Sequence, residues 1–178
     1  MLTFTENSDI GQMHPIERKL IYDVVRQTQP AICVECGTWK GAGSTFFIAN
    51  ALEENQKGIL HTWEPDTALY EFAVKFYEDK PLLKNRIKSY NSDFLEGIKQ
   101  FPVIDFALLD GPDLPDFTLA LVKHLETVMV KNTFVIVHDW NVDKCLTLKP
   151  YLQSNQTNWK IVHEINNTST GMCCFRRL

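Results

Sequence analysis

Two polar stretches that could carry out chemistry follow apolar runs in the second half of the chain. Asp110 comes directly after residues 103–109 (VIDFALL), and His138 and Asp139 come directly after residues 133–137 (TFVIV). Such runs are typical of buried strands, and ligands of open α/β sheets bind outside the carboxyl ends of their strands. We therefore expect the three side chains at one sheet edge. His138 could act there as a general base, or it could be a structural residue of the core.

A glycine-rich turn in the first half could bind a nucleotide-like ligand. Residues 31–34 (AICV) predict a buried strand that Glu35 ends, and Gly37, Gly41 and Gly43 follow. Glycine permits positive φ and lets a ligand approach the main chain closely. A helix predicted directly behind the turn would add unpaired N–H groups at its N-terminus. We expect ligand binding at the carboxyl end of this strand.

The residues around the turn discriminate between three kinds of nucleotide site. Ser44 or Thr45 could cap the helix, but no lysine precedes either, which excludes a Walker A loop. The dinucleotide fingerprint GxGxxG does not match the spacing of Gly37, Gly41 and Gly43. The third kind is an S-adenosylmethionine (SAM) site, in which an acid ends the strand and the turn lies along the amino-acid tail. A tight strand–helix turn without a ligand is the structural alternative.

The turn resembles the first motif of class I SAM-dependent methyltransferases, most closely that of small O-methyltransferases of the catechol O-methyltransferase type. That motif reads roughly E-x-G-[TA]-x-x-G-x-S, and this chain matches it with Glu35, Gly37, Thr38 and Gly41. Gly43 stands where serine is usual, and a serine follows immediately. The resemblance extends over nearly the whole chain and implies SAM as the cofactor.

An acid about 20 residues beyond a glycine turn is a second feature of nucleotide sites. Glu64 ends a strand predicted over 58–63 and lies 21 residues past Gly43. In dinucleotide folds such an acid holds the ribose hydroxyls, and SAM carries the same ribose. The alternative is a solvent-exposed glutamate before a turn.

The resemblance implies a role for each residue of the cofactor site. Glu35 would lie near the positively charged part of SAM, and Glu64 would bind the ribose. Ser92 and Asp93 follow a short strand predicted over 85–90 and would reach the adenine, although Asp93 could instead cap the next helix. The expected cofactor-binding residues are Glu35, Gly37, Thr38, Gly41, Gly43, Glu64, Ser92, Asp93 and Asp110.

The catechol-type family also holds a magnesium ion, and this sequence matches its ligands in part. Asp110 and Asp139 match the two aspartates, whereas Trp140 stands at the asparagine position and Asn141 comes one residue later. Asp113 stands where the family has its lysine base. The expected catalytic residues are Asp110, His138 and Asp139, and the expected Mg²⁺ ligands are Asp110, Asp139 and Asn141. Without a metal, His138 is the expected base.

The segment before the first helix could close the cofactor site. Pro15 is suited to open a helix, and residues 10–14 (IGQMH) come just before it. In the catechol-type family the matching segment carries a glycine and passes over the cofactor. The resemblance therefore implies that Met13 or His14 closes the site.

Strand and helix signals alternate along the chain and end in a predicted hairpin, residues 159–165 and 171–176. This order predicts an α/β, Rossmann-like three-layer sandwich. We expect a seven-stranded, mostly parallel sheet with strand order 3-2-1-4-5-7-6 and strand 7 antiparallel. Residues 1–178 are expected to form a single domain, with 1–12 as a polar arm.

The composition excludes several classes of partner. The net charge of −4 does not favour nucleic acid, and no apolar stretch is long enough to span a membrane. The polar N-terminus predicts a cytoplasmic protein, and the five cysteines are expected to be reduced.

The predicted function is SAM-dependent methylation of a hydroxyl on a small molecule. The alternatives are a SAM-fold binding module without catalysis and an NAD-dependent enzyme, which the glycine spacing disfavours. The acceptor loops carry no recognisable signature, so the sequence does not identify the acceptor or the oligomeric state.

Overall fold

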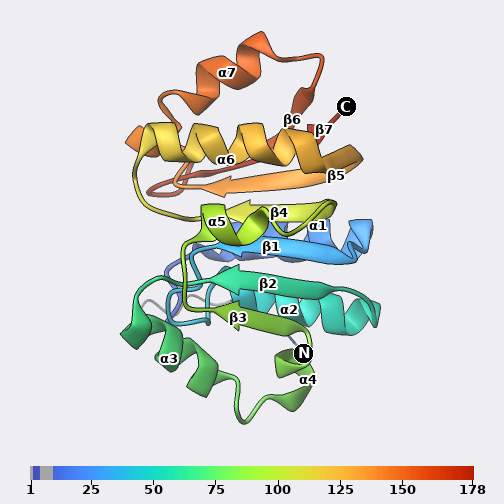
Figure 1. The fold of residues 1–178 in the computed structure, drawn as a ribbon, viewed down its shortest axis with the longest axis vertical. Helices are drawn as coiled ribbons and strands as arrows, with labels where there is room; N and C mark the ends of the chain where they lie inside the picture. The colour runs from blue at the N-terminus through green and yellow to red at the C-terminus, as the bar shows by residue number, and fades with distance from the viewer. Residues whose placement is uncertain (1, 5–9) are drawn as a thin grey trace. The chain divides into compact units, whose positions relative to one another are not determined.

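The computed structural model describes residues 2–4 and 10–178, which fall into two compact units divided after Ile98. The strand order is β3-β2-β1-β4-β5-β7-β6, in a mixed seven-stranded sheet with flanking helices (Figure 1). Strand β7 is antiparallel to both of its neighbours. The predicted fold class and strand order are therefore confirmed.

The first unit contains three parallel strands, of which β1 and β2 are almost completely buried. Its strands are β1 (Ile32–Cys36), β2 (Ile59–Trp63) and β3 (Ile87–Tyr90), and its helices are α1 (Pro15–Thr28), α2 (Ser44–Asn55), α3 (Thr67–Phe76), α4 (Pro81–Lys84) and α5 (Phe94–Ile98). Apolar runs suit β1 and β2 because a parallel sheet is covered on both faces. The register pairs Cys33 with Leu60 and Glu35 with Thr62, so both strands end at the same edge.

Helices α1 and α2 pack against each other in this unit. Pro15 occupies the first turn of α1, as predicted, where its missing N–H costs no helical hydrogen bond. Ile21 and Val25 have no exposed surface and form the buried stripe of the helix. This packing places the segment before α1 close to the start of α2.

The second unit contains two parallel strands followed by an antiparallel pair (Figure 1). Its elements are β4 (Ile104–Leu109), α6 (Pro115–Val128), β5 (Met129–His138), the 3₁₀ turn η1 (Asp143–Cys145), α7 (Leu148–Ser154), β6 (Trp159–Ile165) and β7 (Met172–Arg177). The predicted terminal hairpin is confirmed by the pairing of β6 with β7. Val137 of β5 pairs with Cys173, so the hairpin continues the sheet beyond β5.

One element of this unit differs from the sequence-based expectation. The sequence predicts a short helix that Asn141 or Asp143 caps and that ends near Pro150, but η1 ends at Cys145 and Pro150 lies in the first turn of α7. Proline is tolerated there because the first N–H groups of a helix have no partner within it.

Two further features of the described residues concern the cysteines and the length of the helices. The five cysteines are buried free thiols, which fits the prediction that they are reduced. Among the described residues, no helix has the length and apolar character needed to cross a membrane.

Candidate active site

Glu35 is the buried anchor of the glycine turn. Its side chain has no exposed surface, and its Oε2 accepts hydrogen bonds from Thr45 Oγ1 and Thr62 Oγ1, each at 2.7 Å. Thr38 also contacts Thr62 through its hydroxyl. The acid that ends β1 therefore ties together β2, the turn and the first residues of α2. Since these contacts are internal, they orient the turn itself.

Two glycines of the turn adopt backbone conformations that other residues rarely adopt. Gly37 has φ 92° and Gly41 has φ 82°. A Cβ at Gly41 would lie 3.0 Å from the ring of Tyr77, whose hydroxyl donates to the Gly41 carbonyl oxygen. Both positions therefore need glycine for conformation, and Gly41 needs it for space as well.

Glu64 lies at the end of β2 with its carboxylate held by main-chain N–H groups. Oε2 accepts from Trp39 N at 2.8 Å, and Oε1 accepts from Asp66 N at 3.1 Å. Only 7% of the residue is exposed. The alternative of a solvent-exposed glutamate is therefore wrong. The turn after β1 and the acid after β2 form one hydrogen-bonded group.

The N-terminus of α2 differs from the expected capping. Gly43 is the N-cap residue, and no side chain caps the helix. Ser44 and Thr45 are already helical, and the Thr45 hydroxyl donates to Glu35 instead. The capping prediction is wrong because the buried acid on β1 is a stronger acceptor for that hydroxyl.

The segment before α1 lies directly on the glycine turn. Ala42 N donates to the carbonyl oxygen of Ile10 at 3.1 Å, and a Cβ at Gly11 would lie 2.6 Å from the carbonyl oxygen of Ala42. The buried Arg18 side chain donates to the carbonyl oxygens of Gly11 and Met13 at 2.7 and 2.8 Å. The segment is thus fixed by main-chain contacts, which sequence patterns do not reveal.

The two candidate closing residues have different surroundings. Met13 is buried, with 3% of its surface exposed. His14 is exposed and precedes α1, where its N–H donates to Glu17 Oε2 at 2.9 Å. His14 therefore takes part in the start of the helix.

The adenine candidates lie in the loop after β3. Ser92 and Asp93 are both exposed, and Asp93 Oδ1 accepts from Glu96 N at 3.0 Å, as expected of a helix cap. Asn91, which the sequence did not single out, donates from Nδ2 to the carbonyl oxygen of Glu64 at 2.8 Å. This contact connects the loop to the end of β2.

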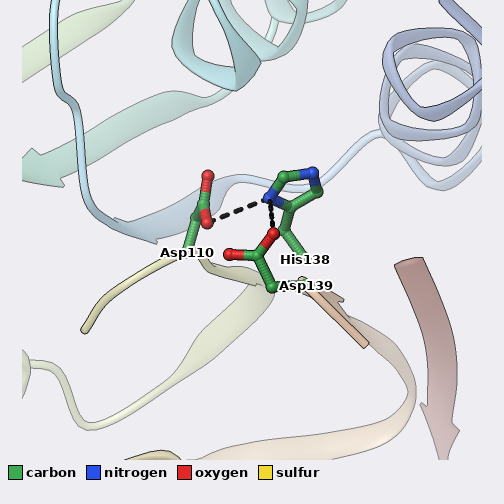
Figure 2. A group of neighbouring side chains, drawn as sticks. All are labelled: Asp110, His138 and Asp139. Atoms are coloured by element: carbon green, nitrogen blue, oxygen red, sulfur yellow. Dashed lines mark hydrogen bonds and ion pairs between the residues drawn. The ribbon is translucent and has the colours of Figure 1, made fainter. Parts of the chain in front are cut away.

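Asp110, His138 and Asp139 come together in the second unit, as predicted from their places after β4 and β5. His138 Nδ1 lies 3.1 Å from Asp110 Oδ1 and 3.2 Å from Asp139 Oδ1 (Figure 2). A nitrogen between two carboxylates carries the proton, so Nδ1 is the donor and Nε2 is the basic nitrogen. Figure 2 shows Nε2 pointing away from both carboxylates. The group could accept a proton at that atom.

Lys144 is the charged residue of this cluster that the sequence did not single out. Its Nζ lies 2.7 Å from Asp139 Oδ2 and 3.3 Å from Asp110 Oδ1, and 1% of its side chain is exposed. It also donates to the carbonyl oxygen of Gly111 at 3.4 Å, and Asp113 Oδ1 lies at 4.0 Å. This lysine belongs to no recognisable sequence motif. It reaches the end of β5 only because the irregular turn η1 folds the chain back.

The charges in this cluster support one another. Burial alone would lower the pKa of Lys144, but the Asp110 and Asp139 carboxylates outweigh it and the pKa is raised. Burial alone would raise the pKa of Asp139, but His138 and Lys144 outweigh it and hold that pKa well below its ordinary value. At neutral pH, Lys144 is therefore cationic and Asp139 anionic.

Asn141, the expected third metal ligand, packs on the hairpin. Its Nδ2 lies 2.5 Å from the position of a Cβ built on Gly171, and its N–H donates to the carbonyl oxygen of Thr170 at 2.7 Å. The preceding Trp140 is buried and donates from Nε1 to Glu164 Oε1 at 2.8 Å. The structure thus brings the two aspartates together and places the Asn141 amide against Gly171.

The part of the sequence that contains both the glycine turn and the cluster around His138 matches a known family. A family model described as a methyltransferase domain matches residues 34–140, which is more than half of the chain. The chain belongs to this methyltransferase family. The predicted membership of the SAM-dependent methyltransferases is confirmed by this match, which includes the glycine turn, Asp110, His138 and Asp139.

Solved structures share the fold of this methyltransferase domain at low sequence identity. A methyltransferase from Geobacter sulfurreducens matches with a TM-score of 0.76 at 18% identity, over 93% of this chain and 80% of that chain. An O-methyltransferase from Bacillus cereus in complex with SAH matches with 0.76 at 15% identity, over 94% and 83%. TomG from Streptomyces achromogenes, an O-methyltransferase involved in tomaymycin synthesis and solved with SAM, matches with 0.74 at 15% identity, over 93% and 81%.

No curated protein matches the methyltransferase domain significantly in sequence. At identities of 15–18% the structural likeness shows the shared fold alone. The chemistry of this domain therefore has to be argued from its own residues.

Proposed function

We propose that this methyltransferase domain transfers a methyl group from SAM to a hydroxyl of a small molecule. The observation that carries the proposal is the bond between Trp39 N–H and the Glu64 carboxylate. It fixes an acid at the edge of β2 beside the glycine turn, where the ribose of a nucleoside cofactor would need an acceptor.

The residues of the first unit fit SAM. The turn has positive φ at Gly37 and Gly41, and the N-terminus of α2 has no side-chain cap, so its first N–H groups suit the carboxylate of an amino-acid tail. Each Glu64 oxygen accepts one main-chain N–H and keeps a second lone pair for a ribose hydroxyl. Gly37, Thr38, Gly41 and Gly43 would line the tail, and Ser92 or Asp93 would reach the adenine.

The second unit supplies a base for the acceptor. When bound, SAM supplies a methyl carbon that is activated by its sulfonium leaving group. His138 Nε2 would take the proton of the acceptor hydroxyl and so make its oxygen the nucleophile. The carboxylates of Asp110 and Asp139 hold the ring through Nδ1 and stabilise the imidazolium that forms.

The same residues do not fit a magnesium ion. The ligand atoms of Asp110, His138 and Asp139 lie within 4.8 Å of one another, which would be close enough for a shared ion. However, Mg²⁺ prefers six oxygen ligands, and here Lys144 Nζ already contacts one oxygen of each aspartate. The packing of Asn141 against Gly171 further weakens the three-ligand prediction. We therefore place the histidine mechanism ahead of the metal mechanism.

The alternative is a SAM-fold module that binds ligand without catalysis. The residues of the second unit distinguish such a module from an enzyme. A binding module would need the Glu64 group but not a histidine held between two carboxylates.

The proposed enzyme acts in the cytoplasm on a small acceptor, without nucleic acid or membrane partners, in line with its negative charge.

Calorimetric titration with SAM and with NAD tests the cofactor. We expect SAM to bind and NAD to give no heat of binding. Glu64→Ala should weaken SAM binding by about 1.5–3 kcal/mol, the scale of a hydrogen bond to a charged group. Glu71→Ala, which removes an exposed carboxylate from α3, is the matched control and should bind SAM normally.

The fold of Glu64→Ala must be checked separately, because the substitution also removes the acceptor of Trp39 N and Asp66 N. A cooperative thermal unfolding transition shows that the variant is folded. Unchanged SAM affinity in a folded variant would contradict the ribose role, and NAD binding to the wild-type domain would contradict the cofactor.

A further inference from the structure

We propose that the Lys144 ammonium takes the place of a divalent cation between Asp110 and Asp139, so that this methyltransferase works without a bound metal. The first half of the proposal, that the ammonium replaces a divalent cation, concerns the cluster alone. The second half, that the enzyme works without a metal, rests on the proposed function. Lys144 acts through the aspartates and is therefore a positioning residue.

The geometry shows a cation already in place. Nζ contacts Asp139 Oδ2 at 2.7 Å and Asp110 Oδ1 at 3.3 Å, so it joins the residue after β4 to the residue after β5. An ion bound to both aspartates would bind the same two carboxylates, next to the ammonium. Since two cations repel each other strongly at such distances, the ammonium and a metal ion exclude one another.

Burial makes the ammonium a fixed part of the site. The side chain of Lys144 is 1% exposed. Besides the two aspartates, its Nζ contacts the Gly111 carbonyl oxygen and, at a longer distance, the Asp113 carboxylate. The adjoining Cys145 is fully buried, and its Sγ lies 3.7 Å from the carbonyl oxygen of Asp139. A buried ammonium with these acceptors would lose them if it swung out, so it does not yield its place readily.

The charge of the cluster also favours a lysine over a metal beside a histidine base. Two carboxylates and one ammonium leave one net negative charge next to His138 Nδ1. A divalent ion in place of the ammonium would cancel that charge. The lysine thus suits a base mechanism, whereas a metal would suit direct activation of the acceptor oxygen.

Titration with Mn²⁺ tests the first half without SAM, acceptor or turnover. The wild-type domain should show no binding below millimolar Mn²⁺ by calorimetry. Lys144→Met keeps much of the side-chain volume and removes the charge, so it should bind Mn²⁺ at least tenfold more tightly. Adding Asp139→Asn to that variant should remove the gain. Lys149→Met, which removes a nearby lysine that lies over the Trp140 ring, is the matched control.

Two results would overturn the proposal. One is wild-type binding of Mn²⁺ below millimolar concentration that Asp139→Asn abolishes, and this measurement does not depend on whether Lys144→Met folds. The other is a folded Lys144→Met variant, shown by a cooperative melt, with no gain in Mn²⁺ binding.

Turnover tests the second half once an acceptor is found. EDTA should leave wild-type turnover within twofold, and Lys144→Met should lose activity that added Mg²⁺ or Mn²⁺ partly restores. Loss of wild-type turnover in EDTA would overturn metal independence. Failure to bind SAM would overturn the proposed function instead, and the Mn²⁺ result would still stand.

Discussion

At the scale of single residues, the orientation of His138 decides what the second unit can do. Its Nδ1 faces Asp110 and Asp139 at 3.1 and 3.2 Å, which assigns the proton to that nitrogen. The residue is 7% exposed, so the position of its ring is defined by packing as well as by charge. A ring held in this way presents Nε2 in one direction, which is what a general base requires.

Replacing His138 separates catalysis from cofactor binding. His138→Gln should lower kcat by about 10²–10⁴-fold, the usual contribution of a general base. SAM affinity should stay within about twofold, since the glycine turn and Glu64, which are proposed to hold SAM, belong to the first unit. The measurement is single-turnover kinetics together with a SAM titration.

The matched control for this prediction is His163→Gln, which changes an exposed histidine on β6. It should leave kcat unchanged. Full activity in His138→Gln would show that another group removes the acceptor proton, and the residues around His14 would then be the next candidates.

At the scale of elements, the turn before α2 is shaped by its contact with the segment before α1. The two meet without side chains, since Gly11 lies on the backbone of Ala42 and Gly43. Such close approach is possible only where the Cβ is missing. The glycine turn is therefore packed by two neighbours, the segment around Gly11 and the Tyr77 ring next to Gly41.

Adding a methyl group at Gly11 should lower the stability of the protein, whereas shortening the exposed side chain next to it should not. Gly11→Ala places a Cβ 2.6 Å from the Ala42 carbonyl oxygen and should reduce the free energy of unfolding by about 1–3 kcal/mol, as overpacking does. Gln12→Ala, which shortens an exposed side chain next to Gly11, is the matched control and should keep the wild-type stability. Urea unfolding without cofactor measures both, and equal stability of the two variants would contradict the contact.

At the scale of the whole molecule, the division into two compact units bears on how the chain unfolds. Residues 1–98 and 99–178 each have their own buried aromatic side chains, among them Trp63 and Trp159. The single domain expected over 1–178 predicts that both units lose structure together. Two independent domains would instead unfold in two steps.

Fluorine labels on the tryptophans can report the two units separately without any substitution. With 5-fluorotryptophan incorporated, the resonances of Trp63 and Trp159 should disappear at the same urea concentration, because two-state unfolding has one midpoint for every probe. Trp63 is 1% exposed and Trp159 is 2% exposed, so both resonances should shift on unfolding. Separate midpoints would contradict the single-domain prediction.

The sequence by itself determined most of the strands and helices, although not the end of the helix near Pro150. Apolar runs, proline at helix starts and the terminal hairpin are local patterns. Together with the family resemblance they predicted the strand order and the meeting of Asp110, His138 and Asp139 at neighbouring strand ends. The glycine turn and Glu64 could be predicted for the same reason, because each directly follows a strand.

Only the tertiary structure decided which partners these residues have. Thr45 bonds to Glu35 instead of capping α2, and Lys144 reaches Asp139 through an irregular turn. Gly11 meets Ala42 across 31 positions of the chain. Hydrogen bonds and ion pairs of this kind depend on distances between side chains and backbone after packing. Periodicity gives the face on which a residue lies, but it does not give the atom that the residue will meet.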